Sequence, residues 1–153
     1  MTLHLREPLP EHIHYLSKHL RESDADEVRS ASGEYSLWKT LDAAVNASYE
    51  CHVAVDDDGI PVAVFGVAPY GEFAAPWLLG TDSLLQHRRE LMSWGRSFVQ
   101  RWLEEHRQLM NFVDKRNAVS IRWLKRLGFT IGKEVLLYDP FHPFYEFKQC
   151  AIQ

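Results

Sequence analysis

Apolar and polar residues alternate along this chain with two spacings, which predict both helices and strands. Apolar side chains recur at helical spacing in segments 10–21, 36–47 and 84–107. A capping signal formed by Ser23-Asp24 with Glu27 predicts a further short helix that ends at Gly33. Short apolar runs bounded by turn residues predict strands. The expected strands are 3–6, 52–56, 60–68, 73–79, 111–114, 129–138 and 144–152.

The order of these elements predicts the fold class. One strand, two or three helices and three antiparallel strands are followed by a helix, a strand, a helix and two final strands. This order is typical of an α/β (α+β) domain with a mixed, mostly antiparallel central sheet flanked by helices. The length of 153 residues fits a single domain spanning 1–153.

Two residues do not fit the strand pattern. Pro76 removes an N–H group from an apolar strand, so we expect a bulge there, a simple edge position, or a strand that starts late, at Trp77. Asn111 interrupts another apolar strand, where an unpaired amide would cost about 1–3 kcal/mol. We expect either a neighbouring strand or a ligand to satisfy it.

Segment 111–129 has the clearest local pattern: a short strand, a turn, a helix and a returning strand. Asn117 stands where a helix N-cap belongs. Gly128 ends the helix and Phe129 opens the next strand. The apolar residues at helical spacing between them are Ile121, Leu124 and Leu127.

The pattern Asn-x-x-Ser-Ile-x-x-Leu-x-x-Leu-Gly-Phe at 117–129 resembles the last strand–helix motif of the GCN5-related N-acetyltransferase (GNAT) superfamily. A wider set resembles a narrower phage and prophage family, described as GNAT-like, that includes the small internal virion (core) protein of short-tailed phages. The residues of that set are Pro76–Asp82, His87, Arg88, Asn111, Val113, Asp114, Asn117, Trp123–Lys125, Pro143 and Phe144. The resemblance covers most of the chain.

The resemblance implies a cofactor, acetyl-CoA, in a cleft between the strand ending at Leu79 and strand 111–114. Backbone groups near Leu78 and Leu79 would hold the pantetheine arm like an added strand. The pyrophosphate would lie on free N–H groups at the start of the long helix. The further cofactor-binding candidates are Gly80, Thr81, Arg88, Arg89, Asn111, Asn117 and Ser120. Asn117 and Ser120 are also reasonable as purely structural residues, and Arg88 and Arg89 as a solvated helix face.

The sequence departs from the superfamily pattern at two places. The usual phosphate loop, Gln/Arg-x-x-Gly-x-Gly/Ala, is absent, and Asp82 would repel a pyrophosphate beside it. Leu124 stands where many GNAT enzymes have a tyrosine that protonates the leaving thiolate. The chain is therefore either an N-acyltransferase that acts on an unidentified amine or a non-catalytic virion or host-interaction protein.

An acceptor amine with a pKa of about 10.4 must lose a proton before it attacks. A carboxylate or histidine would take that proton. The catalytic candidates are Glu72, just before the central strand, and Asp114, followed by Asp82 and His142. Each of them is also a reasonable surface or capping residue.

Charge and composition narrow the possible partners. The net charge of −4 argues against a general nucleic-acid binder. Residues 1–82 hold 5 Lys/Arg and 14 Asp/Glu, whereas residues 83–153 hold 12 and 7. The basic second half suits a phosphate-bearing ligand, although surface scatter of charge would look the same.

The sequence also predicts a location. The N-terminus has no apolar signal region, and no apolar run approaches the roughly 18 residues of a membrane span. Cys51 and Cys150 have neither metal-binding nor redox spacing, so we expect no metal and reduced thiols. The expected location is the cytoplasm of a host cell, or a virion.

Overall fold

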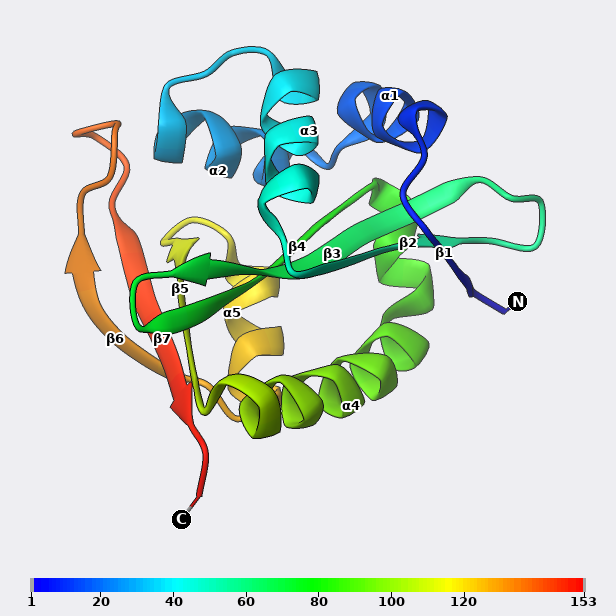
Figure 1. The fold of residues 1–153 in the computed structure, drawn as a ribbon. Coiled ribbons are helices and arrows are strands. Elements are labelled where there is room, and N and C mark those ends of the chain that lie inside the picture. Colours follow the sequence, from blue (N-terminus) through cyan, green and yellow to red (C-terminus); the bar gives the residue numbers. More distant parts are fainter. Residues whose placement is uncertain (1, 153) are drawn as a thin grey trace.

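A seven-stranded sheet is the centre of the computed structural model, which describes residues 2–152 (Figure 1). The strands are β1 (His4–Arg6), β2 (Glu50–Val55), β3 (Pro61–Tyr70), β4 (Phe73–Gly80), β5 (Gln108–Asp114), β6 (Thr130–Val135) and β7 (Phe144–Cys150). Their order in the sheet is β1-β2-β3-β4-β5-β7-β6. Every neighbouring pair is antiparallel except β4 and β5, which are parallel. The predicted mixed, mostly antiparallel sheet is confirmed.

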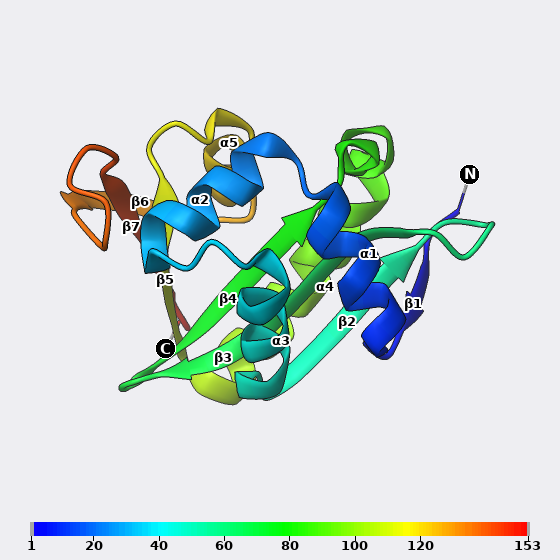
Figure 2. The ribbon, with the colours of Figure 1, turned by 90° about the horizontal axis from the view of Figure 1, so that it is seen from above.

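Helices cover both faces of this sheet (Figures 1 and 2). Helices α1 (Pro10–His19), α2 (Glu22–Ser32) and α3 (Leu37–Ala47) cover one face, and α4 (Arg88–His106) and α5 (Ala118–Arg126) cover the other. A 3-10 turn, η1 (Asp82–His87), precedes α4. The element order therefore agrees with the order read from the sequence, with three helices after the first strand.

Several boundaries differ from the sequence-based expectation. Helix α4 begins at Arg88 rather than at residue 84, because the chain first forms η1 and then leaves helical geometry at His87, where φ is −111° and ψ is 18°. Strand β5 begins at Gln108 because Arg107 ends α4 in the left-handed conformation, with φ of 70°. Strand β6 ends at Val135, before residue 138.

Strand β4 accommodates Pro76 without a bulge or a late start, so these two expectations for the proline were wrong. The pairing of β4 with β3 continues from Phe73 to Gly80 without a register shift. The N–H of Thr81 donates to the carbonyl of Val62, so odd-numbered residues of β4 direct their peptide groups toward β3. Pro76 is even-numbered. Its missing N–H would point away from β3, and no hydrogen bond of that ladder is lost.

A half-buried carboxylate ties the sheet to α4. Glu50 of β2 accepts hydrogen bonds from Arg101, from His52 Nε2 at 2.6 Å and from Trp102 Nε1 at 3.0 Å. These bonds, with that from Arg101 first, lower the pKa of Glu50 to about 2. The ionised carboxylate therefore stabilises the contact between sheet and helix at neutral pH.

Replacing Glu50 with alanine should lower the free energy of unfolding by about 1–3 kcal/mol at pH 7, because the indole N–H of Trp102, a residue that is 3% exposed, loses its acceptor. The wild-type contribution is present above the unfolded pKa of about 4.5 and is lost as the pH falls toward 2. Urea unfolding at several pH values measures both effects. The exposed Glu104→Ala on α4 is the control, and an equal loss of stability in both variants would contradict the assignment.

Candidate active site between β4 and β5

The two parallel strands at the centre of the sheet touch at one point and then separate. Ala74 of β4 is paired with Leu109 of β5, and this is the single bridge between the two strands among residues 2–152. Just beyond it, the side-chain amide of Asn111 donates to the carbonyl of Pro76 at 3.0 Å and accepts from the N–H of Phe112 at 2.8 Å. Asn111 is therefore satisfied by the neighbouring strand and marks the start of a gap.

Separation leaves the peptide groups of β4 that face β5 without a partner strand. Those of Gly80 are taken by the α1–α2 junction, since its N–H donates to Asp24 Oδ2 at 2.8 Å and its carbonyl accepts from the N–H of Arg21 at 2.8 Å. Leu78 faces the same way, by the two-residue alternation of a strand. Within residues 2–152, neither its N–H nor its carbonyl has a hydrogen-bond partner. Leu78 thus presents a free donor and a free acceptor to the gap.

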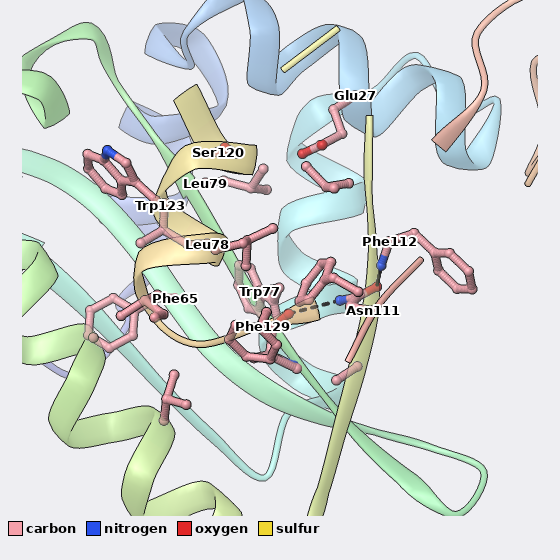
Figure 3. Close-up of a pocket in the computed structure, with 18 of the residues that line it drawn as sticks. Glu27, Phe65, Trp77, Leu78, Leu79, Asn111, Phe112, Ser120, Trp123 and Phe129 are labelled. Atoms are coloured by element: carbon pink, nitrogen blue, oxygen red, sulfur yellow. Dashed lines mark hydrogen bonds between the residues drawn. The ribbon is translucent and has the colours of Figure 1, made fainter. Parts of the chain in front are cut away.

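The gap opens into a largely apolar cavity of about 410 Å³ (Figure 3). Its walls come from α2 and α3 on one face of the sheet and from α4 and α5 on the other, so the cavity passes between the two strands. Four tryptophans contribute to it: Trp77, Trp94, Trp102 and Trp123. Apart from these indoles, the polar residues that line it are Glu27, Asn111 and Ser120.

Glu27 is the one charged side chain of the cavity wall within the described chain, and it lies on the α2 side (Figure 3). Its Oε1 accepts a hydrogen bond from the N–H of Asp114 at 2.7 Å. Burial raises the pKa of Glu27 to about 8, with smaller contributions from the nearby carboxylates of Asp24 and Asp114 and against the lowering effect of the hydrogen bond from the N–H of Asp114. Among residues 2–152, no cation forms an ion pair with Glu27.

Behind the cavity, three buried side chains join the α1–α2 junction to α5. Asn117 Oδ1 accepts from the N–H of Ser120 at 3.3 Å and from Arg21 Nη2 at 3.4 Å, and its Nδ2 donates to Asp24 Oδ1 at 3.3 Å. Asp24 and Asn117 are 1% and 2% exposed. We call Arg21, Asp24 and Asn117 the polar bridge. The expected N-cap at Asn117 is confirmed, whereas a cofactor contact at this residue stays a prediction.

Some of the predicted cofactor-binding residues line the cavity, and others lie outside it. Leu78, Leu79, Asn111 and Ser120 line it. Because Leu79 is paired with Val64 in the ladder with β3, only its side chain reaches the cavity.

The remaining cofactor candidates lie around the gap rather than in it. Gly80 is held by the polar bridge, and Thr81 Oγ1 is bonded to the carbonyl of Val62 at 3.2 Å. Arg88 and Arg89 are exposed at the start of α4, where they line a second, smaller cavity of about 350 Å³. Their roles in cofactor binding stay predictions.

Neither catalytic candidate from the sequence lies in the cavity. Glu72 is exposed in the turn before β4. Asp114 is buried and forms two hydrogen bonds with the Arg116 guanidinium, at 3.0 and 2.7 Å, so its carboxylate is already paired. Asp82 is exposed, and His142 is paired with Asp139.

The sequence interpretation missed Glu27, which it took for part of a capping signal. A signal for it was present. The residues Asp24, Glu27, Val28 and Ala31 follow the i, i+3, i+4, i+7 spacing of an inward helix face. Two acidic residues on such a face indicate a buried polar function rather than a solvated surface.

Within residues 2–152, no group of three or more His, Cys, Asp or Glu side chains is arranged to hold a metal ion. Over the same residues, no helix combines the length and the apolar character needed to cross a membrane. Cys51 and Cys150 both carry free thiols.

Comparison with solved structures relates this fold to known acetyltransferases. Ard1 from Thermoplasma volcanium is 19% identical, with a TM-score of 0.68 and coverage of 100% of both chains. A GNAT superfamily phosphinothricin acetyltransferase from Sinorhizobium meliloti, solved with acetyl-CoA, is 14% identical, with a TM-score of 0.67 over 99% of this chain and 89% of that one. PaiA N-acetyltransferase from Thermoplasma acidophilum, solved with coenzyme A, is 13% identical, with a TM-score of 0.65 over 99% and 100%.

These likenesses show that the chain has the GNAT fold over its full length. No protein-family model and no curated protein matches the sequence. The fold expected from the sequence is therefore confirmed, while the similarity to a phage family has no support from these comparisons.

The raised pKa of Glu27 predicts how stability depends on pH. The protonated carboxyl contributes stability that is present below the unfolded pKa of about 4.5 and is lost as the pH rises toward 8. Glu27→Gln keeps an acceptor for the N–H of Asp114 and removes this loss, so its melting temperature at pH 8 should exceed the wild-type value by about 3 °C or more. At pH 4 the difference should vanish.

Thermal melts at pH 4 and pH 8 measure this prediction. Glu22→Gln, on the exposed side of the same helix, is the matched control. A Glu27→Gln protein that is less stable than the wild type at pH 8 would show that Glu27 is ionised and paired in the native state.

Proposed function

We propose that this protein is an N-acyltransferase that transfers an acetyl group from acetyl-CoA to an amine. The observation that carries the proposal is the free peptide group of Leu78 at the edge of an apolar cavity, in a chain with the fold of acetyltransferases. An unpaired strand edge can take an extended amide chain as an added strand. The pantetheine arm of coenzyme A is such a chain.

The residues around the cavity fit an acetyl-CoA arm on one side of the sheet. The N–H and carbonyl of Leu78 would bond to its amide groups, and the walls of Trp94 and Trp123 would exclude water from it. The guanidinium groups of Arg88 and Arg89 would bind the phosphates. They would replace the missing glycine-rich loop by charge, because the N–H of Gly80 is already bonded to Asp24.

The same cavity contains a carboxyl group that could accept a proton from the acceptor amine. When bound, acetyl-CoA supplies the acetyl group as a thioester. Glu27 would take the proton that an ammonium group must lose before its nitrogen can attack. No tyrosine lines the cavity in the described chain, and Leu124 occupies the wall instead. A thiol with a pKa of about 8.5 is a leaving group that needs no strong acid.

A second candidate function is a non-catalytic GNAT-fold protein, such as a virion component or a protein that binds a host factor. The polar bridge favours it, because Arg21 and Asp24 cover Gly80, where the cofactor would otherwise pass toward the helix start. The phage context and a location in the host cytoplasm or the virion stay predictions from the sequence.

Acetyl-CoA should raise the melting temperature of the purified protein. A ligand at 100 times its Kd adds about 2.7 kcal/mol, which for a domain of this size is roughly 5–10 °C. Replacing Arg88 and Arg89 together with alanine should weaken binding roughly tenfold, a loss of about 1.4 kcal/mol. Isothermal titration calorimetry with acetyl-CoA and with free CoA measures the affinity directly.

The double variant Lys18→Ala/Lys133→Ala is the matched control, since it removes two exposed positive charges elsewhere. It should bind like the wild type at 0.15 M salt. Equal affinity for acetyl-CoA in all three proteins would show that Arg88 and Arg89 do not bind its phosphates. No thermal shift at millimolar acetyl-CoA would favour the non-catalytic function.

A further inference from the structure

The cavity has two ends with different chemistry. On the face of α4 and α5 it is lined by large aromatic and aliphatic side chains, next to the free peptide group of Leu78. On the opposite face it is lined by Glu27, Val28 and Ala31 of α2 and by Ala44 of α3. If the cofactor arm fills the first end, the second end is where an acceptor would meet it.

A single carboxyl group dominates this second end. Glu27 projects from α2, and the charged groups around it already form ion pairs with one another. On the α1–α2 side, Asp24 lies 3.9 Å from Arg21. On the β5 side, Asp114 is paired with Arg116 at 2.7 Å. Glu27 is thus the one carboxyl group of this cluster without a cationic partner among residues 2–152, and a bound ammonium group would complete its pairing.

The rest of this end is apolar. Its other walls are the side chains of Val28, Ala31 and Ala44, together with Trp77 and Leu79 of β4, which pack on the same face of the sheet. The indole N–H of Trp77 is already bonded to Ser48 Oγ at 2.9 Å.

Asn111 is the amide side chain that lines the cavity in the described chain, and both ends of its side chain are occupied by Pro76 and Phe112. The amide of Asn117, which also lies beside Glu27, is occupied by Arg21, Asp24 and the N–H of Ser120. A carboxylate or a row of hydroxyl groups on the acceptor would lose its hydration here without gaining a partner.

We infer that the acceptor is a small primary amine on an apolar body, an alkylamine or arylalkylamine with no carboxylate beside the nitrogen. This inference rests on the proposed acyl transfer and adds the substrate class. Glu27 binds the ammonium group and then takes one of its protons. The reaction forms a nitrogen–carbon bond and breaks the carbon–sulfur bond of the thioester. The second proton of the ammonium group ends on the sulfur.

The test compares amines that differ in one group. Phenethylamine and L-phenylalanine differ by a single carboxylate, while hexylamine and glucosamine extend the comparison to an alkyl and a polyhydroxy body. Acetylated product is measured by chromatography, because the free thiols of Cys51 and Cys150 would disturb a thiol-reactive dye. Phenethylamine and hexylamine should exceed the other two in kcat/KM by about 100-fold or more.

Glu27→Gln should lower kcat/KM for phenethylamine by about 100-fold or more and leave the affinity for acetyl-CoA unchanged. Glu22→Gln, on the exposed side of α2, should behave like the wild type. The wild-type kcat/KM should rise with pH through a pKa near 8, and this limb should be missing in Glu27→Gln.

Two results would overturn the inference: L-phenylalanine or glucosamine used as well as phenethylamine, or a Glu27→Gln enzyme equal to the wild type. A separate measurement covers the case in which no amine is acetylated and the proposed function fails. Phenethylamine alone should then still raise the melting temperature of the wild type and not of Glu27→Gln. Absence of that shift would overturn the amine site itself.

Discussion

The feature on which this molecule depends is the divergence of β4 and β5 after the single bridge between Ala74 and Leu109. Parallel strands that separate in the middle of a sheet leave two rows of peptide groups without partners. Burying such groups unpaired is unfavourable, so other parts of the chain must satisfy them. Asn111 does so at the start of the gap, and Asp24 and Arg21 do so at its end. Between them, Leu78 remains free.

The need to satisfy these peptide groups explains why the helices lie where they do. Helix α2 lies over the gap (Figure 2) because two of its acidic residues accept hydrogen bonds from strand edges. Asp24 binds the N–H of Gly80, and Glu27 binds the N–H of Asp114. Helices α4 and α5 close the opposite face with apolar side chains, and Gly95 of α4 allows the close approach of Leu127, the residue that follows α5. The result is a cavity that is apolar on one side of the sheet and acidic on the other.

Much of the fold could be read from the sequence because its signals are local. The helix cap at Asn117 and the glycine stops at Gly33 and Gly128 all lie where the local chemistry requires them. The exceptions also have local causes. Pro76 indicated a disturbed strand, but the direction in which its missing N–H would point depends on the register with β3, which the sequence does not reveal.

The candidate site was harder to predict, since it depends on contacts between distant segments. Asp114 looked like a free carboxylate until its pairing with Arg116 was visible, and Glu72 was chosen for its position before β4 although it lies in an exposed turn. Glu27 is 87 residues from the N–H group that it accepts from. Only the fold brings these groups together. Glu27 is recognised as the carboxyl group without a cationic partner among residues 2–152 only when the pairing of Asp24 with Arg21 and of Asp114 with Arg116 is known.

The most direct test of this account is amide hydrogen exchange at Leu78, followed by NMR with and without acetyl-CoA. In the free protein, the N–H of Leu78 should exchange much faster than those of Trp77 and Leu79, which face the ladder with β3. Saturating acetyl-CoA should slow exchange at Leu78 by about tenfold or more and leave its two neighbours nearly unchanged. A Leu78 amide that is already protected in the free protein, or that acetyl-CoA leaves unaffected, would contradict the proposal that this strand edge holds the cofactor.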